Sequence, residues 1–338
     1  EIIFKHDVYP DSLKQSPEYI IYEYVKDAAV TMLNDRLSEA VQKSDCPFVD
    51  ANASDDNYIF AKTKGAFALS ATPKDMSLVA PSLKAILVEA RKAAEFGFTP
   101  TEYARFKETQ LSAIDKMYSN KDKRYNSQFY EQCKGNFLSN EPMPSIDYTY
   151  EMMKQIIPSI PLEYINGFME QLLPKNDSNM VILNFNNEKE GKVYPTKESL
   201  LKAVADVRAE KLEAYVDNVK DEPIMTTLPK KGSIKKEIKN EQLGYTELQL
   251  SNGAKVILKK TDLKQDQVLL RGEGVGGASL YGKEDYTNFK VFGNVMEASG
   301  LGNFTNTELQ KALAGKIAGA SLDISRTRVN VSGSSTPK

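Results

Sequence analysis

A long amphipathic segment near the start of the chain constrains the fold most. Ser16 and Pro17 are typical of a helix start, because Ser caps the first turn and Pro loses no hydrogen bond at the first helical position. Apolar residues then recur at helical spacing, namely Ile21, Val25, Ala28, Met32, Leu37 and Val41. The pattern therefore predicts one long helix with an apolar face that packs against another layer.

Strands and helices alternate through the first two thirds of the chain. Residues 58–72 are strand-like with residues 47–53 as a hairpin partner, and residues 179–185 form a short apolar strand. Helices are expected to start at Thr72-Pro73 and, with a capping box, at Thr99 to Glu102. Further helices are predicted over residues 125–137, 145–157, 162–173 and 197–218. This succession predicts an α/β (α+β) fold with helices on one face of an antiparallel or mixed sheet.

The length of 338 residues predicts two domains, and the boundary follows from composition. Residues 228–233 are polar and contain Pro and Gly, and a run of Lys and Glu follows over residues 235–241. We therefore expect one domain over residues 1–228, a solvated linker over 229–245 and a second domain over 246–338. That second domain is expected to contain a hairpin turning at Asn252-Gly253, a strand over 267–272, a helix over 284–299 and two strands within 318–332.

Charge and hydropathy exclude two classes of partner. The chain has 44 basic and 46 acidic residues, so its formal charge of −2 does not provide the basic footprint of a nucleic-acid-binding protein. No apolar run approaches the roughly 20 residues that a bilayer span requires. We therefore expect neither nucleic acid as a partner nor a membrane span.

Histidine and cysteine are too scarce for most hydrolytic sites. The chain has one histidine, His6, so neither H-x-x-E-H nor H-E-x-x-H occurs in it, and a Ser-His-Asp triad would have to use His6. An isolated histidine near the start is expected to lie at the surface or to fill a core. Cys46 and Cys133 are expected to be buried, unreactive thiols. We assign no catalytic and no metal-binding residue to this chain, and its substrate-binding residues stay unknown.

Two further sets of residues could carry chemistry. Residues 272–277 (GEGVGG) match the G-x-G-x-x-G pattern of dinucleotide-binding folds, but no helical stripe begins inside the motif, so a flexible connection is favoured. The acidic residues without a partner at diagnostic spacing are expected to be exposed: Asp55, Asp56, Asp285, Glu297 and Glu308. The 17 tyrosines include Tyr19, Tyr22 and Tyr24, which are expected to pack helices on the sheet, with a peptide-binding wall as the alternative.

Several segments resemble one family, the pitrilysin-like (insulinase-like, inverzincin) zinc metallopeptidases. Residues 250–259 (LSNGAKVILK) resemble the strand that opens each half of these enzymes, and residues 276–281 (GGASLY) resemble their glycine pair after the next strand. Residues 300–311 (GLGNFTNTELQK) are similar to the corresponding stretch of the degenerate second half. Residues 8–11 (VYPD) and 32–39 (MLNDRLSE) resemble the second domain of the active half.

The resemblance implies an enzyme of two homologous halves, each a pair of α/β domains, that close like a clam around a peptide chamber. Its zinc site, H-x-x-E-H with a downstream Glu, lies in the first domain of the first half, where the Glu acts as base on a zinc-bound water. This chain would contain the second domain, the linker and the opening of the degenerate third domain. The position of the zinc helix in that third domain is near residues 285–290 and has no histidine, so zinc is expected in the full-length parent and not in this chain.

The resemblance therefore implies a non-catalytic central portion of a zinc-dependent metalloendopeptidase, which shapes the substrate chamber and is inactive by itself. Its partners would be a peptide or small-protein substrate and the rest of its own chain. The alternatives are an inactive scaffold or binding subunit of the same fold and, from the glycine-rich motif, a nucleotide binder. The start at Glu1 without Met predicts a piece of a longer protein, and the family favours a bacterial periplasm or cell envelope. Substrate identity and oligomeric state stay open.

Overall fold

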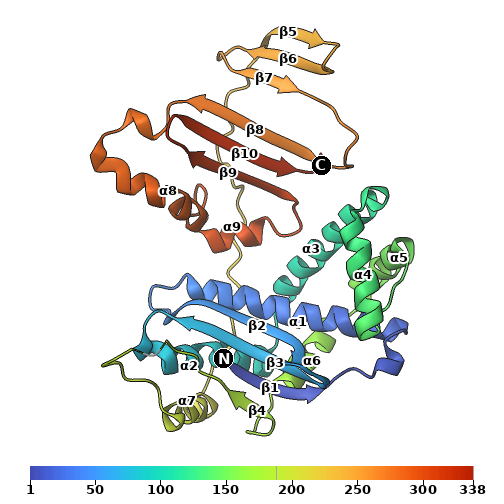
Figure 1. Cartoon of the computed structure of the whole chain (residues 1–338), viewed down its shortest axis with the longest axis vertical. Helices are drawn as coiled ribbons and strands as arrows, with labels where there is room; N and C mark the ends of the chain where they lie inside the picture. Colours follow the sequence, from blue (N-terminus) through green and yellow to red (C-terminus); the bar gives the residue numbers. More distant parts are fainter. Residues whose placement is uncertain (188, 338) are drawn as a thin grey trace. The chain divides into compact units, whose positions relative to one another are not determined.

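The computed structural model describes residues 1–187 and 189–337 and divides into two compact units. Unit 1 comprises Glu1–Ile114 and Asn126–Asn218, and unit 2 comprises Asp115–Tyr125 and the chain from Val219 onward. The predicted combination of helices with antiparallel sheets is confirmed in both units (Figure 1). Among the described helices, none combines the length and apolarity that a bilayer crossing requires.

Unit 1 is built on a four-stranded antiparallel sheet. Its strands lie in the order β2-β3-β1-β4 and are β1 (Ile2–Asp7), β2 (Phe48–Tyr58), β3 (Ala61–Pro73) and β4 (Met180–Ile182). The predicted hairpin of residues 47–53 with 58–72 is confirmed as β2 and β3. Strand β1 was not expected, and it lies between β3 and β4, with His6 opposite Gly65. As a result, β1 and β2 are separated by the whole width of β3.

Helices surround this sheet in the sequence, and several of them pack on it. The helices are α1 (Pro17–Val41), α2 (Val79–Phe96), α3 (Pro100–Ser119), α4 (Asn126–Ser139), α5 (Ile146–Ser159), α6 (Leu162–Leu172) and α7 (Lys197–Ala209). Helix α1 contacts β2, α2 and α6, and α2 contacts β3, α6 and α7. The apolar stripe predicted for α1 is buried at Val25, Ala28, Met32 and Leu37, where it meets Phe67 and Leu69 of β3 in one core. The amphipathic pattern therefore locates the core correctly.

The helix starts predicted in unit 1 are confirmed in position with one exception, although the Ser16 side chain makes no capping hydrogen bond before α1. The capping box before α3 is formed: the Thr99 backbone N–H donates to Glu102 Oε2 at 2.7 Å, and the Glu102 backbone N–H donates to Thr99 Oγ1 at 3.2 Å. The start predicted at Thr72-Pro73 is wrong. Pro73 ends β3 opposite Phe48, and α2 begins at Val79 after a 3₁₀ turn that Asp75 caps. A proline at the last position of a strand needs no ladder N–H, so sheet pairing extends to it.

The helix predicted over residues 197–218 ends early. Helix α7 stops at Ala209, and the following segment binds α1 and α3 through its side chains. Tyr215 donates its hydroxyl to Glu39 at 2.8 Å, and Asp217 accepts hydrogen bonds from Arg105 at 2.7 and 3.1 Å. These tertiary contacts hold residues 210–218 in a non-helical path.

Unit 2 contains two three-stranded antiparallel sheets. One has the order β5 (Ile234–Asn240), β6 (Tyr245–Leu250), β7 (Lys255–Leu258), and the other has the order β8 (Val268–Val275), β10 (Arg328–Ser335), β9 (Ala318–Ile324). Helices α8 (Tyr286–Ala298) and α9 (Asn306–Ala312) belong to the same unit. The hairpin at Asn252-Gly253 is confirmed, with Gly253 at a φ of +88°. Residues 234–240, expected within a solvated linker, instead form β5, because their backbone pairs with β6.

The two units differ in how much apolar surface they bury. Of the buried apolar residues in the described part of the chain, Phe304 alone belongs to unit 2. Large apolar side chains of unit 2 are open to solvent, including Leu269 at 70 % and Val275 at 89 % exposure. Exposed apolar faces of this kind are typical of surfaces that another polypeptide covers.

Candidate functional site

The single histidine of the chain has a specific partner that no spacing in the sequence indicates. The imidazole of His6 lies across Gly65 on the central strand β3, and its Nε2 lies 2.6 Å from Oδ1 of Asp55 on β2. Gly65 makes this possible, because a Cβ at that position would lie 2.4 Å from His6 Cε1. The structure therefore joins β1 and β2 by a side-chain pair that passes over the strand between them.

Hydrogen bonding indicates that His6 is protonated. Its Nδ1 lies 2.9 Å from the backbone carbonyl of Asp7, and its Nε2 faces the Asp55 carboxylate, so each ring nitrogen faces an acceptor. The imidazolium form donates to both. The hydrogen bond with Asp55 is the largest cause that raises the pKa of His6 above 6.5, although partial burial opposes it. Since neither nitrogen is free to accept a proton from a substrate, His6 is placed as a structural partner of Asp55 and not as a general base.

Asp55 occupies a position that the strand pattern assigns to the core. It follows the buried Ala53 by two residues, so both side chains lie on the same face of β2, and the Asp55 side chain is only 2 % exposed. Oδ1 is bound by His6, but Oδ2 is buried and has no hydrogen-bond partner among the described residues. An unpartnered buried carboxylate oxygen is uncommon and costs free energy, so this atom calls for an explanation.

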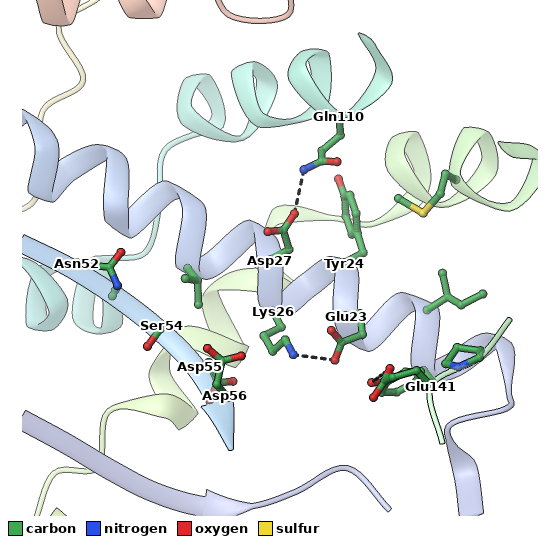
Figure 2. A pocket seen from close by; sticks show the side chains of 16 residues that line it. Glu23, Tyr24, Lys26, Asp27, Asn52, Ser54, Asp55, Asp56, Gln110 and Glu141 are labelled. Atoms are coloured by element: carbon green, nitrogen blue, oxygen red, sulfur yellow. Dashed lines mark hydrogen bonds and ion pairs between the residues drawn. The ribbon is translucent and has the colours of Figure 1, made fainter. Parts of the chain in front are cut away.

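Asp55 lines an open pocket of about 690 Å³ between α1 and β2 (Figure 2). Side chains from α1 and β2 form most of the wall, and Gln110 of α3 and Glu141 contribute to the rest. The charged residues of the lining are five carboxylates and one lysine, namely Glu23, Asp27, Asp55, Asp56, Glu141 and Lys26. The pocket is therefore strongly acidic.

The neighbours of these carboxylates compensate only part of the negative charge. Glu23 pairs with Lys26 at 2.8 Å, and Glu141 pairs with Lys14 at 3.2 Å. Asp27 accepts a hydrogen bond from the neutral amide of Gln110 at 2.9 Å, as Figure 2 shows. The exposed Asp56 has no ion pair in the described part of the chain. Asp27 and Asp56 therefore keep negative charge in the pocket beside Asp55.

Tyrosines complete the wall of the pocket. Tyr19 and Tyr24 line it, and Tyr22 lies in a smaller adjoining cavity that also contains His6 and Asp55. Burial raises the pKa of Tyr22 to about 12, with the negative charge of Asp55 as the next cause, and burial likewise raises the pKa values of Tyr19 and Tyr24. All three hydroxyls are therefore neutral near pH 7. The burial of Tyr19 and Tyr24 agrees with the expected packing role, and the alternative of a peptide-binding wall stays a prediction.

The other carboxylates singled out in unit 2 lie outside this pocket. Glu308 closes a capping box with Thr305 at the start of α9, and Asp285 stands at the N-cap of α8. Glu297 lies within α8. Asp55 was expected to be exposed, and that expectation is wrong, because its strand turns the side chain toward the core. The burial of Asp55 could have been predicted only from its spacing, because it lies two residues after the apolar Ala53 and therefore on the same face of the strand.

The glycine-rich motif lacks the geometry of a dinucleotide site. Strand β8 ends at Val275, a 3₁₀ turn covers Ala278–Leu280, and α8 begins only at Tyr286. No helix N-terminus therefore lies inside the motif to hold a pyrophosphate. Gly277 serves close packing instead, with a φ of +87° and a Cβ position that would lie 2.5 Å from the Ser325 carbonyl oxygen.

The cysteine prediction is half right. Cys46 is buried, and its thiol donates to the Phe48 carbonyl at 3.4 Å. Cys133 is exposed, because α4 buries none of its residues. Neither cysteine lines the acidic pocket.

The donor groups of this chain do not fit a zinc site. Its one histidine has both ring nitrogens engaged, and the described residues hold no group of three His, Cys, Asp or Glu side chains placed to bind a metal ion. A zinc peptidase site needs three protein ligands around the ion. Zinc chemistry can thus be assigned to no residue that the structure describes here.

The chain is similar in sequence to two zinc proteases. The chain is 27 % identical over 243 residues to a zinc protease PQQL-like protein of Arabidopsis thaliana, a match covering 71 % of this chain and 25 % of the relative. It is 22 % identical over 287 residues to the probable zinc protease PqqL of Escherichia coli, covering 83 % of this chain and 30 % of the relative. The chain thus spans between a quarter and a third of the length of these relatives. No family model matches the chain.

Solved structures share the fold. The periplasmic protease PqqL from Escherichia coli superposes with a TM-score of 0.54 at 18 % identity, covering 99 % of this chain and 36 % of that chain. The ferredoxin protease FusC, solved in complex with Arabidopsis ferredoxin, superposes with a TM-score of 0.57 at 12 % identity and the same coverage. The chain is therefore similar to zinc proteases over part of their length and shares the fold of these solved proteases, in agreement with the resemblance of its sequence to the pitrilysin-like zinc metallopeptidases.

Proposed function

We propose that this chain is a non-catalytic central portion of a zinc-dependent metalloendopeptidase that hydrolyses peptides in a closed chamber. The observation that carries the proposal is the match to two zinc proteases over most of this chain but over a minor share of their length. In this role the chain shapes the substrate chamber, and the residues that bind zinc and cleave the peptide bond lie outside it.

The chemistry of the chain supports a non-catalytic role. Zinc hydrolases activate water with a metal held by several histidine or carboxylate ligands, and here the one histidine is held between Asp55 and Asp7. The pocket beside this pair has carboxylates and neutral tyrosine hydroxyls, which suit recognition of a polar or cationic group. Binding and shaping are thus the functions that its side chains can perform.

The domain arrangement is part of the proposal. We assign residues 1–228 to the second domain of the first half, residues 229–245 to a linker that includes strand β5, and residues 246–338 to the opening of the degenerate third domain. The exposed apolar side chains of unit 2, such as Leu269 and Val275, support a role inside a larger protein, where further polypeptide would cover them.

The proposal also includes a substrate class and a cellular location, and both are supported by the proteins that this chain resembles. FusC is a ferredoxin protease, and its complex with ferredoxin supports a peptide or small protein as the substrate class. The Escherichia coli relative is a periplasmic protease, which supports a periplasmic location. Neither nucleic acid nor a membrane is a proposed partner.

Zinc content and cleavage test the proposal. The parent protein and this chain would each be dialysed, analysed for zinc by atomic absorption and assayed on a quenched fluorescent peptide. The parent is expected to retain one zinc per chain and to cleave the peptide, whereas this chain is expected to do neither. Stoichiometric zinc in this chain would contradict the non-catalytic assignment. A parent that lacks H-x-x-E-H and cleaves nothing would support the scaffold or binding subunit instead.

A further inference from the structure

We propose that the acidic pocket between α1 and β2 binds the guanidinium group of an arginine side chain in a peptide. The source of that peptide rests on the proposed function, in which substrate enters the parent enzyme. The binding itself is a property of this chain, because every residue that lines the pocket belongs to unit 1.

The first support is the unpartnered oxygen of Asp55. The Asp55 side chain is 2 % exposed and lines the pocket, and its Oδ2 has no hydrogen-bond donor among the described residues. His6 uses Oδ1 only, so the carboxylate keeps one unused acceptor. A donor that enters from the pocket would satisfy this oxygen, and a charged donor forms the stronger hydrogen bond with a carboxylate.

The second support is the charge that surrounds this oxygen. Lys26 neutralises Glu23, but the printed partners of Asp27 are neutral, namely the Gln110 amide and the Thr31 hydroxyl, and Asp56 has no ion pair in the described part of the chain. The two aspartates at the end of β2 and the acidic side chains of α1 border the same hollow in Figure 2. A cation entering the pocket therefore meets negative charge from both walls, which favours its binding over that of a neutral group.

A guanidinium group fits this pocket better than the other common cations. It is planar, presents several N–H donors and is weakly hydrated, so it loses little when it enters a partly buried site and can reach more than one carboxylate. A metal ion is disfavoured because the described residues place no three metal ligands together.

The test compares peptides that differ only in the end group of one side chain. Isothermal titration of this chain would use alanine tripeptides with arginine, lysine or the neutral isostere citrulline at the centre. Acetylated N-termini and amidated C-termini leave the side chain as the sole cation. The arginine peptide is expected to bind at least about tenfold more tightly than the citrulline peptide, because only arginine supplies a charged donor. Equal affinity for arginine and citrulline, or for arginine and lysine, would overturn the proposal.

Variants and a direct probe locate the binding. Asp55→Asn is expected to abolish the preference for arginine, whereas Asp50→Asn, an exposed aspartate on the same strand outside the pocket, is expected to leave it unchanged. Should Asp55→Asn unfold by far-UV circular dichroism, Asp56→Asn replaces it and is expected to weaken arginine binding. A second measurement needs no variant. In the wild-type chain, the arginine peptide is expected to shift the NMR signals of the His6 imidazole. An unshifted His6 signal at saturating peptide would place the binding elsewhere and refute the proposal.

Failure of the arginine-binding proposal and failure of the proposed function give different experimental results. A parent enzyme that cleaves peptides while this chain shows no preference for arginine would refute the pocket assignment alone. A chain that prefers arginine in a parent that binds no zinc and cleaves nothing would refute the peptidase function and leave the pocket standing.

Discussion

His6 Nε2 lies 2.6 Å from Asp55 Oδ1, although the two residues are on strands that do not pair with each other. Their strands are separated by β3, and the contact exists because Gly65 leaves room for the imidazole to cross it. The pair fixes one oxygen of a carboxylate at the acidic pocket and leaves the other without a donor. Stability, protonation and binding at this pocket are therefore linked through two side chains.

The His6–Asp55 pair is expected to stabilise unit 1 more at low pH than at high pH. The fold raises the pKa of His6, so the pair's contribution is fully present below the unfolded value of 6.5 and is lost as the pH rises through the folded pKa. The difference in unfolding free energy between the wild type and His6→Ala is thus expected to shrink from about pH 5.5 to about pH 8.5. Urea unfolding followed by circular dichroism measures it, and a difference that grows with pH would contradict the assigned protonation.

Replacing Gly65 by alanine is expected to displace the imidazole. The added methyl group would lie 2.4 Å from His6 Cε1, so the ring must move away from Asp55, and we expect a loss of about 1–3 kcal/mol. The chain has one histidine, so its NMR titration is unambiguous, and the pKa of His6 should fall toward 6.5 in this variant.

Gly167→Ala in α6 is the matched control for that substitution. A Cβ at this position meets no atom within 4 Å, and alanine is the better helix former. We expect unchanged or slightly increased stability and an unchanged His6 titration. Loss of stability in both variants would mean that the effect at Gly65 is not specific to the imidazole.

The buried pair of Arg36 and Glu102 is expected to dominate the stability of the packing between α1 and α3. Arg36 donates to both oxygens of Glu102, at 2.7 and 2.8 Å, and both side chains are buried. Glu102→Gln leaves a buried guanidinium without its counter-charge, so a loss of about 3–5 kcal/mol is expected in urea unfolding. The exposed pair of Glu170 and Lys175 gives the comparison, and Glu170→Gln should cost less than about 1 kcal/mol. Similar losses at the two sites would show that burial does not decide the effect.

The segment after α7 is expected to loosen when its anchor on α3 is removed. Asp217 accepts two hydrogen bonds from Arg105, and Tyr215 lies against the Arg36 guanidinium at 4.2 Å from its ring centre. In Asp217→Asn, hydrogen–deuterium exchange should become faster over residues 210–218 while α1 stays protected, because the core does not depend on this contact. Asp221→Asn, four residues further on, should change neither region. Unchanged exchange in Asp217→Asn would show that the segment is held by Tyr215 instead.

Local patterns predicted much of unit 1 and the hairpin of unit 2. The start of α1 at Ser16-Pro17, the capping box of α3 and the turn at Asn252-Gly253 all depend on residues close in sequence, so they could be predicted without knowledge of the fold. The start of α2 and the end of α7 could not, because pairing of Pro73 with β2 and the contacts of Tyr215 and Asp217 outweigh local helix propensity there.

The absence of a zinc-binding motif was determined by the residues alone, since one histidine cannot form it in any fold. The acidic pocket was decided only by tertiary structure. His6 and Asp55 are 49 residues apart, and they meet because β1 inserts beside β3 and because Gly65 has no side chain to block the crossing. Periodicity reports which face of a strand is buried, but strand order is set by long-range pairing that no local pattern records.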